Sequence, residues 1–287
     1  MPSLKEIKGR IASVNSTLKI TSAMKMVASA KLHRAQAAIE SMLPYEKKLN
    51  GILAGFLSSE GAVSSPYAEK RDVERVAVVA VSSNSSLCGA FNANVIRKTQ
   101  ATIADYAKLG PDNIRLFPIG RKVADAVRKA GYKSEGDYLS MAEKPTYKEA
   151  SELASRLMGM FVAGEIDRVE LVYNHFKSTA TQVLMREQYL PLSIESVAGA
   201  GLSTDYILEP GRDALIRTLV PQVLSLKIFT ILLDSNAAEH AARTIAMQMA
   251  TDNATELIQQ LTVQYNKSRQ QQITNELLDI VSGEAAG

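Results

Sequence analysis

The sequence predicts an α/β fold combined with a coiled coil: an antiparallel pair of long N- and C-terminal helices with an inserted, mostly parallel α/β domain. Residues 3–57 and 212–283 are glycine-poor and rich in helix-favouring residues, whereas the segment between them alternates β-branched apolar runs with helical patterns. A helix over 3–57 would span roughly 80 Å, far more than the width of a small domain. We expect a helix over 1–60, a Rossmann-like domain over 74–192 and a second helix over 208–287.

The first helix has a recognisable start and a regular apolar seam. Ser3 followed by Glu6 fits a capping box. Apolar side chains then recur at heptad steps of 3, 4, 3 and 4, at Leu4, Ile7, Ile11, Val14 and Leu18. Beyond Leu18 the seam becomes small and methionine-rich, which favours a helix that meets different neighbours along its length. Pro44 predicts a kink or a local break.

The inserted segment follows a linker at residues 58–74. Apolar runs predict strands at 76–82, 114–119, 168–173 and 181–190, and helices are expected after Ser86 through Leu109, at 121–130 and at 146–163. The first run, VAVVAVS, is apolar at successive positions, as in a strand buried on both faces. Strand–helix alternation of this kind predicts a mostly parallel sheet with helices on its faces.

The last helix is expected to follow a loose stretch at residues 193–209. Pro210 suits a helix start, and Pro221 predicts a break. Apolar and small residues beyond Pro221 again step by 3, 4, 3 and 4, at Val223, Leu226, Thr230, Leu233 and Ala237. From there to Gly283 no proline or glycine interrupts the chain, so the simplest architecture pairs this helix antiparallel with the first.

Charge and cysteine content narrow the function classes. The net charge is +3, but residues 1–48 hold nine Lys or Arg against three Glu, which gives 9 − 3 = +6 on the first helix. Such a helix can meet nucleic acid, anionic lipid or an acidic protein surface, although most charge runs are solvated faces. Cys88 is the only cysteine, so no internal disulfide is possible. The longest nearly apolar run, Val223–Leu233, is too short to cross a bilayer.

A search for catalytic and binding motifs predicts no catalytic, cofactor-binding or metal-binding residues. There is no G-x-x-x-x-G-K-[ST] loop and no G-x-G-x-x-G after a strand. The turns at 76–92 and 119–122 could seat a phosphate on a helix N-terminus, but ordinary domain turns are the favoured interpretation. Cys88 is predicted to be buried and structural, and Glu239 with His240 to be a pair on a helix surface.

The C-terminal end of the chain is harder to explain as an ordinary helix. The residues from Ile273 to Val281 place apolar side chains around several sides of the helix, more than one partner helix can cover. We expect a partner protein to sheathe this end.

Several motifs, in order along the whole chain, resemble the gamma-subunit family of F-type ATP synthases. The resemblance covers Leu4–Gln36, Leu87–Asn92, Tyr173-Asn174 with Phe176, Glu209-Pro210, Glu239–Arg243, Ala246-Met247, Ala250–Ala254, Tyr265–Lys267 with Arg269-Gln270, Ile273-Thr274 with Glu276, and Ile280-Val281 with Gly283. One departure is Asn84-Ser85-Ser86, which stands where the family usually has an Asp-Arg-Gly-like triplet, so a salt bridge made by that arginine is in doubt. The chain also lacks the cysteine-pair insert of chloroplast members, and its start without a leader looks bacterial.

The resemblance implies a rotating shaft without an active site of its own. Its expected partners are the alpha and beta subunits of the catalytic ring, the epsilon subunit and the c-subunit ring, with no cofactor, no nucleic acid, and membrane contact only through the c ring. The expected location is peripheral, on the cytoplasmic face of the bacterial inner membrane. By the same resemblance, Met24, Lys25 and Arg243 lie at the lower rotor–stator contact, and Gln270, Thr274 and Glu276 at the upper one.

Two alternatives from other function classes remain. The basic first helix beside an α/β domain is compatible with a nucleic-acid-binding or scaffold protein with a coiled-coil arm, although no aromatic platform accompanies it. A dinucleotide-binding enzyme is the other alternative, and the missing glycine fingerprint argues against it.

Overall fold

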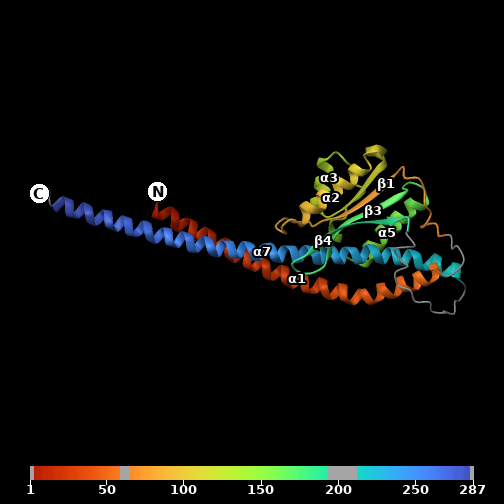
Figure 1. The fold of residues 1–287 in the computed structure, drawn as a ribbon, viewed down its shortest axis with the longest axis horizontal. Coiled ribbons are helices and arrows are strands. Elements are labelled where there is room, and N and C mark those ends of the chain that lie inside the picture. Colours follow the sequence, from red (N-terminus) through yellow and green to blue (C-terminus); the bar gives the residue numbers. More distant parts are fainter. Residues whose placement is uncertain (1–2, 59–64, 193–211, 285–287) are drawn as a thin grey trace. The chain divides into compact units, whose positions relative to one another are not determined.

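The structure, a computed structural model, describes residues 3–58, 65–192 and 212–284. Two long helices, α1 (Leu4–Ser58) and α7 (Arg212–Glu284), flank the strands and shorter helices in sequence (Figure 1). The chain forms two compact units. We call Met1–Ala28 with Thr244–Gly287 the helix-pair unit, and Ser29–Arg243 the α/β unit.

The α/β unit contains a four-stranded sheet in the order β2-β1-β3-β4. The strands are β1 (Val76–Val81), β2 (Ile114–Ile119), β3 (Arg168–Phe176) and β4 (Gln182–Leu190). β1 pairs in parallel with both β2 and β3, so that Val79 lies opposite Phe117 on one side and Leu171 on the other. β4 runs antiparallel to β3. The predicted fold class, with its mostly parallel sheet, is confirmed.

Helices cover both faces of this sheet (Figure 1). They are α2 (Phe91–Asp105), α3 (Arg121–Lys129), α4 (Leu139–Glu143) and α5 (Tyr147–Val162), with short 3-10 turns η1 (Ala107–Leu109) and η2 (Pro111–Asn113) after α2. Because strand side chains alternate between faces, Val78 packs toward α2 and α3, whereas Val79 packs toward α5. Every residue of β1 is buried, which explains its uninterrupted apolar run.

The α1 and α7 segments of the α/β unit complete the core beneath α5. Leu49 and Leu53 of α1 and Val220 and Leu224 of α7 join the α5 side of the sheet. The Tyr189 hydroxyl of β4 donates to the Leu224 carbonyl at 3.0 Å, which fixes α7 to the sheet edge. Further along the pair, small residues allow close helix contact, with Leu32 and Ala35 packed on Ala237 and Ala241. The two helices therefore run antiparallel within this unit.

The helix-pair unit is also antiparallel but has a much thinner core. The Thr251 hydroxyl donates to the Thr21 hydroxyl at 2.9 Å, and the Lys25 ammonium donates to the Gln248 side chain at 2.8 Å. The backbone amide of Glu6 donates to the Ser3 hydroxyl at 3.2 Å, as the predicted cap requires. The apolar side chains that are buried in the described part of this unit are those of Ile7, Ala28, Met247, Ala254 and Leu261.

The predicted break at Pro221 is wrong, and α1 is not broken at Pro44, where a kink stays a prediction. α1 continues through Pro44 and α7 continues through Pro221. An internal proline costs about 3 kcal/mol. At Pro221 the neighbours Val220 and Leu224 are buried, and burial of such side chains contributes about 1.5–3 kcal/mol each, which offsets that cost. Pro44 lies on an exposed face, where water can bond the carbonyl that its missing amide leaves free.

Other boundaries differ by a few residues. β3 extends three residues beyond the predicted strand because Asn174 still lies in the sheet against β4. The helix expected after Ser86 begins only at Phe91 and breaks into η1 before Leu109. The loose stretch at 193–209 and the helix start at Pro210 lie outside the described residues. The three-domain division stays a prediction, since the two compact units cut both long helices.

One described helix is long and apolar enough to pass a simple membrane-span test. An 18-residue window within Arg217–Leu278 has a mean hydropathy of 1.3, but 61% of that window is buried inside the protein. Core helices pass the same test, so the buried surface of α7 accounts for its apolar composition.

Candidate functional site

Of the two helix N-termini considered for a phosphate, the one at 119–122 is occupied by the protein's own polar groups. The first amides of α3 donate to the loop after β1: Arg121 N to Asn84 Oδ1 at 3.0 Å, Lys122 N to Ser83 O at 3.2 Å, and Val123 N to Ser82 Oγ at 3.0 Å. Gly120 has φ +91°, and a Cβ there would lie 2.2 Å from the Ser82 carbonyl oxygen. Because these contacts occupy the amides, the turn is a structural junction, in agreement with the interpretation that the sequence favoured.

The residues Asn84, Ser85 and Ser86 connect this loop to the rest of the α/β unit without an arginine of their own. Asn84 Nδ2 donates to the Leu139 carbonyl at 2.9 Å. Arg243 of α7 donates through its Nη2 to Ser85 Oγ at 2.8 Å and through its Nη1 to the Ser86 carbonyl. The guanidinium that holds this loop therefore comes from α7.

Arg243 is itself held by a buried carboxylate. Its Nε donates to Glu239 Oε1 at 2.8 Å, and Nη2 contacts the same oxygen. His240 Nδ1 lies 2.7 Å from Glu239 Oε2. Burial favours the neutral acid, but the hydrogen bond from His240 and the charges of His240 and Arg243 outweigh it and hold the pKa of Glu239 below its ordinary value. Only 7% of Glu239 and 8% of His240 are exposed, so the predicted surface pair is wrong: the packing of α7 against the 83–91 loop encloses it.

Cys88 lies beside this cluster and is buried, as predicted. Its sulfur accepts from Asn92 Nδ2 at 3.1 Å and lies 3.9 Å from Ser83 Oγ. Burial raises the pKa of the thiol, which keeps it protonated and unreactive at neutral pH. The preceding Leu87 has φ +68° and is 60% exposed, an unusual backbone for a leucine that no sequence pattern pointed to.

The other predicted lower-contact residues belong to the helix-pair unit. Met24 and Lys25 are both partly exposed, and Lys25 bonds Gln248 of the opposite helix. Nearby Met26 is 63% exposed. Arg243 belongs to the α/β unit, so the described geometry within each unit does not join these three residues into one site.

The predicted upper-contact residues lie on an exposed stretch of α7. The side chains of Gln270, Thr274 and Glu276 are exposed. Their side-chain hydrogen bonds stay within the helix: Thr274 Oγ1 donates to the Gln270 carbonyl at 2.9 Å, and Gln272 Nε2 donates to Glu276 Oε1 at 3.0 Å. Large apolar side chains share this stretch with exposed fractions of 48% to 63%, at Ile273, Leu277, Leu278 and Ile280. We call residues 270–280 the distal segment.

No group of three or more His, Cys, Asp or Glu side chains that could hold a metal ion occurs among the residues that the structure describes. His175 and His240 contact carboxylates, with His175 Nδ1 2.6 Å from Asp234 Oδ2, and His33 is exposed.

Comparisons with known proteins agree along the whole chain. The ATP synthase family model matches residues 3–286. The ATP synthase gamma chain of Phocaeicola vulgatus is 61% identical over 289 residues, covering all of both chains, and that of Bacteroides thetaiotaomicron is 60% identical over 295 residues, covering 99% of each. Among solved structures, a chain of the Euglena gracilis mitochondrial ATP synthase in rotational state 3 has a TM-score of 0.69 at 21% identity, covering 99% of this chain and 94% of that chain.

A second Euglena gracilis structure, of the ATP synthase rotor in rotational state 1, has a TM-score of 0.64 and covers 94% of this chain and 98% of that chain, also at 21% identity. These structures support the fold, and the high-identity sequences support the family. The chain belongs to the gamma-chain family of ATP synthases.

Proposed function

We propose that this chain is the central rotor shaft of its ATP synthase and transmits torque between a membrane c ring and a catalytic ring of alpha and beta subunits. The observation that carries the proposal is the distal segment, where four large apolar side chains stay about half exposed or more in the chain alone. A helix end of this kind gains stability when a partner sleeve covers it, at about 1.5–3 kcal/mol for each fully buried side chain.

The chain itself is proposed to carry no catalytic residues. Of the two strand–turn–helix junctions considered for a phosphate, the one at 119–122 has its helix amides bonded to Asn84, Ser83 and Ser82. The buried Glu239 is bound to Arg243 and His240 and packs beneath a loop. Nucleotide chemistry is then assigned to the partner subunits, and this chain acts on them mechanically.

The contacts with the stator are proposed at two levels. Met24, Lys25 and Arg243 form the lower set, and Gln270, Thr274 and Glu276 form the upper set. Partly exposed methionine and lysine side chains suit a moving contact. The methionine adapts its shape to each partner, and the lysine ammonium acts over a distance through its charge. The α/β unit is proposed to stand with the epsilon subunit on the c ring, which places the chain on the cytoplasmic face of the inner membrane. No described feature specifically favours the nucleic-acid or scaffold alternative.

Truncation of the distal segment tests this proposal. A chain that ends before Ile280 is assembled with its partners in membranes, and complex stability, ATPase rate and ATP-driven proton pumping are measured together. We expect weaker assembly before any loss of catalysis. The unfolding of the isolated truncated chain serves as the control and should be unchanged. Undiminished assembly of the truncated chain would show that no sleeve covers this end.

A further inference from the structure

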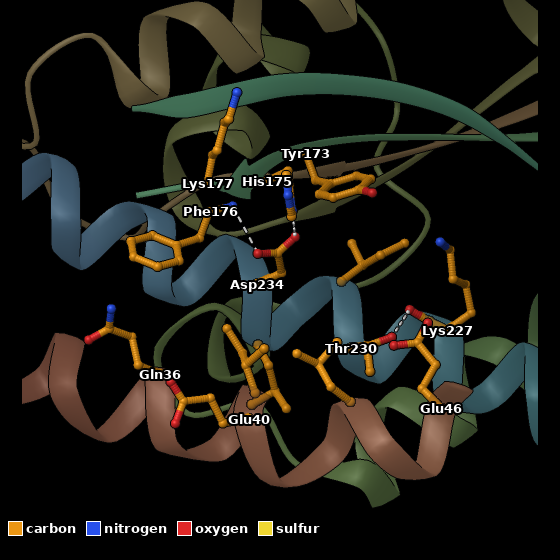
Figure 2. Close-up of a pocket in the computed structure, with 14 residues that line it drawn as sticks. Gln36, Glu40, Glu46, Tyr173, His175, Phe176, Lys177, Lys227, Thr230 and Asp234 are labelled. Atoms are coloured by element: carbon orange, nitrogen blue, oxygen red, sulfur yellow. Dashed lines mark hydrogen bonds and ion pairs between the residues drawn. The ribbon is translucent and has the colours of Figure 1, made fainter. Parts of the chain in front are cut away.

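A cavity in the α/β unit is lined by none of the residues proposed to contact partner subunits. It has a volume of about 430 Å³ and is lined by α1, β3 and α7 (Figure 2). Small-molecule sites commonly have volumes of about 300–1,000 Å³ and combine apolar walls with a few convergent polar groups. This cavity has both features, and it is made entirely from residues of one compact unit.

The apolar wall comes from all three elements. Ile39 and Leu43 stand one turn apart on α1, Phe176 closes the β3 side, and Ile231 and Leu233 line α7. Leu43 remains 40% exposed, so this wall is open to an entering group. A short aliphatic chain could lie along it and remove that surface from water.

Most of the charges around the cavity are already matched. The Asp234 carboxylate accepts from the Phe176 amide at 2.8 Å and contacts His175 Nδ1 at 2.6 Å, as the dashed lines in Figure 2 show. The Lys227 ammonium lies 3.1 Å from Glu187 Oε1 of β4. Lys177 extends away from α1 and α7 (Figure 2). The positive groups at the cavity are thus either paired or directed elsewhere.

Glu46 is the exception among these charged groups. Its side chain is partly buried, and no hydrogen bond or ion pair joins that side chain to another residue in the described part of the chain. Burial raises the pKa of Glu46; Lys227 opposes this, while the nearby Asp234 and Glu187 add to it. A second carboxylate, Glu40, lies at the exposed side of the same wall. The cavity therefore has an excess of negative charge beside an apolar surface.

We propose that this cavity binds an ammonium group carried on a short aliphatic stem. The ammonium pairs with Glu46, while the stem lies on Ile39, Leu43 and Ile231. A neutral alcohol of the same length lacks the ion pair, and a carboxylate of the same length is repelled. The ammonium comes either from a free alkylamine or from a lysine of a partner subunit. This site is independent of the rotor proposal, because its binding is measured on the chain alone.

The first experiment measures binding of hexylammonium, hexanol and hexanoate to the full-length chain by NMR or calorimetry. We expect hexylammonium to bind at least tenfold more tightly than the other two. Glu46→Gln should reduce hexylammonium affinity at least fivefold, whereas Glu152→Gln, which changes an exposed carboxylate of α5, should leave it unchanged. Equal binding of the three probes, a preference for hexanoate, or an unchanged affinity in Glu46→Gln would overturn the proposal.

A second experiment identifies the source of the ammonium in the assembled complex. A carbodiimide couples a carboxylate to a lysine only when the two groups touch. A cross-link from Glu46 to a partner subunit, absent in Glu46→Gln, supports a partner lysine. Hexylammonium binding that persists in the complex without such a cross-link supports a free amine. Loss of the probe's binding in the complex with no cross-link would show that the complex blocks the cavity, and would overturn a role for it there.

Discussion

The α/β unit and the helix-pair unit differ in how far they bury their large apolar side chains. In the α/β unit, large residues on strands and helices such as Phe117, Phe161 and Leu171 are almost completely buried. In the described part of the helix-pair unit, five apolar residues are buried while eleven large ones are exposed. The first unit can complete its core with its own residues. The second leaves most of its large apolar side chains exposed in the chain alone, and we propose that partner subunits cover them.

The largest expected effect contrasts two truncations to alanine, one in each unit. Phe161→Ala opens a cavity at a fully buried position and should destabilise the isolated chain by about 3–5 kcal/mol. Leu277→Ala, at a side chain that is 57% exposed, should leave the isolated chain within about 0.5 kcal/mol of its parent but weaken assembly. Denaturant unfolding of each chain, followed by reconstitution, measures both. A Leu277→Ala chain that unfolds much more easily would mean that the distal segment already has a partner within its own chain.

A second prediction concerns the charged cluster of the α/β unit. Glu239→Gln leaves the Arg243 guanidinium, with only 12% of its side chain exposed, without its carboxylate, which should cost about 3 kcal/mol at pH 7. Because the pKa of Glu239 is lowered in the folded chain, its stabilising effect is present above the ordinary pKa and is lost as the pH falls through the folded value. The difference between variant and parent should therefore shrink as the pH falls from about 5 to 3. A difference that stays constant over this range would show that the carboxylate's charge is not what stabilises the cluster.

A third prediction tests whether the exposed surface of the helix-pair unit contacts the stator. Met24→Lys adds an ammonium to a helix that already carries Lys19, Lys25 and Lys31. If Met24 faces an acidic loop of a beta subunit, the new ion pair should hold one rotary position by roughly 1–3 kcal/mol, as charge-assisted hydrogen bonds do. ATP-driven proton pumping should then fall more than the ATPase rate in the same membranes, and neutralising the facing acid should restore coupling.

The matched control for this variant is Met26→Lys, which adds the same charge two residues along the helix at a side chain that is 63% exposed. We expect it to affect coupling less, because positions two apart do not share a helix face. Equal losses of pumping and ATPase in Met24→Lys, or no loss in either, would place Met24 away from the rotor–stator contact.

The smallest expected effect is at Cys88. Cys88→Ser should leave assembly and activity nearly unchanged, because the thiol is a buried packing group that makes weak contacts with Ser83 and Asn92. The raised pKa of this thiol predicts slow reaction with alkylating reagents at pH 7 and faster reaction as the pH rises toward 9. Oxidant sensitivity of the complex that disappears in Cys88→Ser would contradict this view.

The sequence predicted the fold where the pattern of side chains reports directly on burial. The run Val76–Val81 is apolar at every position because both faces of β1 are covered, and the heptad steps from Leu4 to Leu18 reflect a pair of helices. The predicted break at Pro221 was wrong because local helix propensity was weighed without the tertiary packing of Val220 and Leu224, which holds the helix together.

The site was less predictable for a similar reason. The burial of Glu239 and His240 depends on a loop about 150 residues earlier in the chain, from which Ser85 and Ser86 contact Arg243. The cavity at Glu46 combines three elements from distant parts of the sequence, and no local motif marks it. The left-handed backbone conformation of Leu87 could not be predicted from the sequence either, because glycine or asparagine usually marks such a position.

The pairing of the first helix with the last also sets an order of events during synthesis. Thr21 and Thr251, which are bonded in the helix-pair unit, are separated by 230 positions in the chain. At about 5–20 residues per second, a ribosome needs roughly 10–50 s to make the second after the first. Throughout that time the apolar seam of the first helix has no partner in its own chain. Production of this subunit therefore depends on keeping a newly made helix from associating with other nascent chains until its partner emerges.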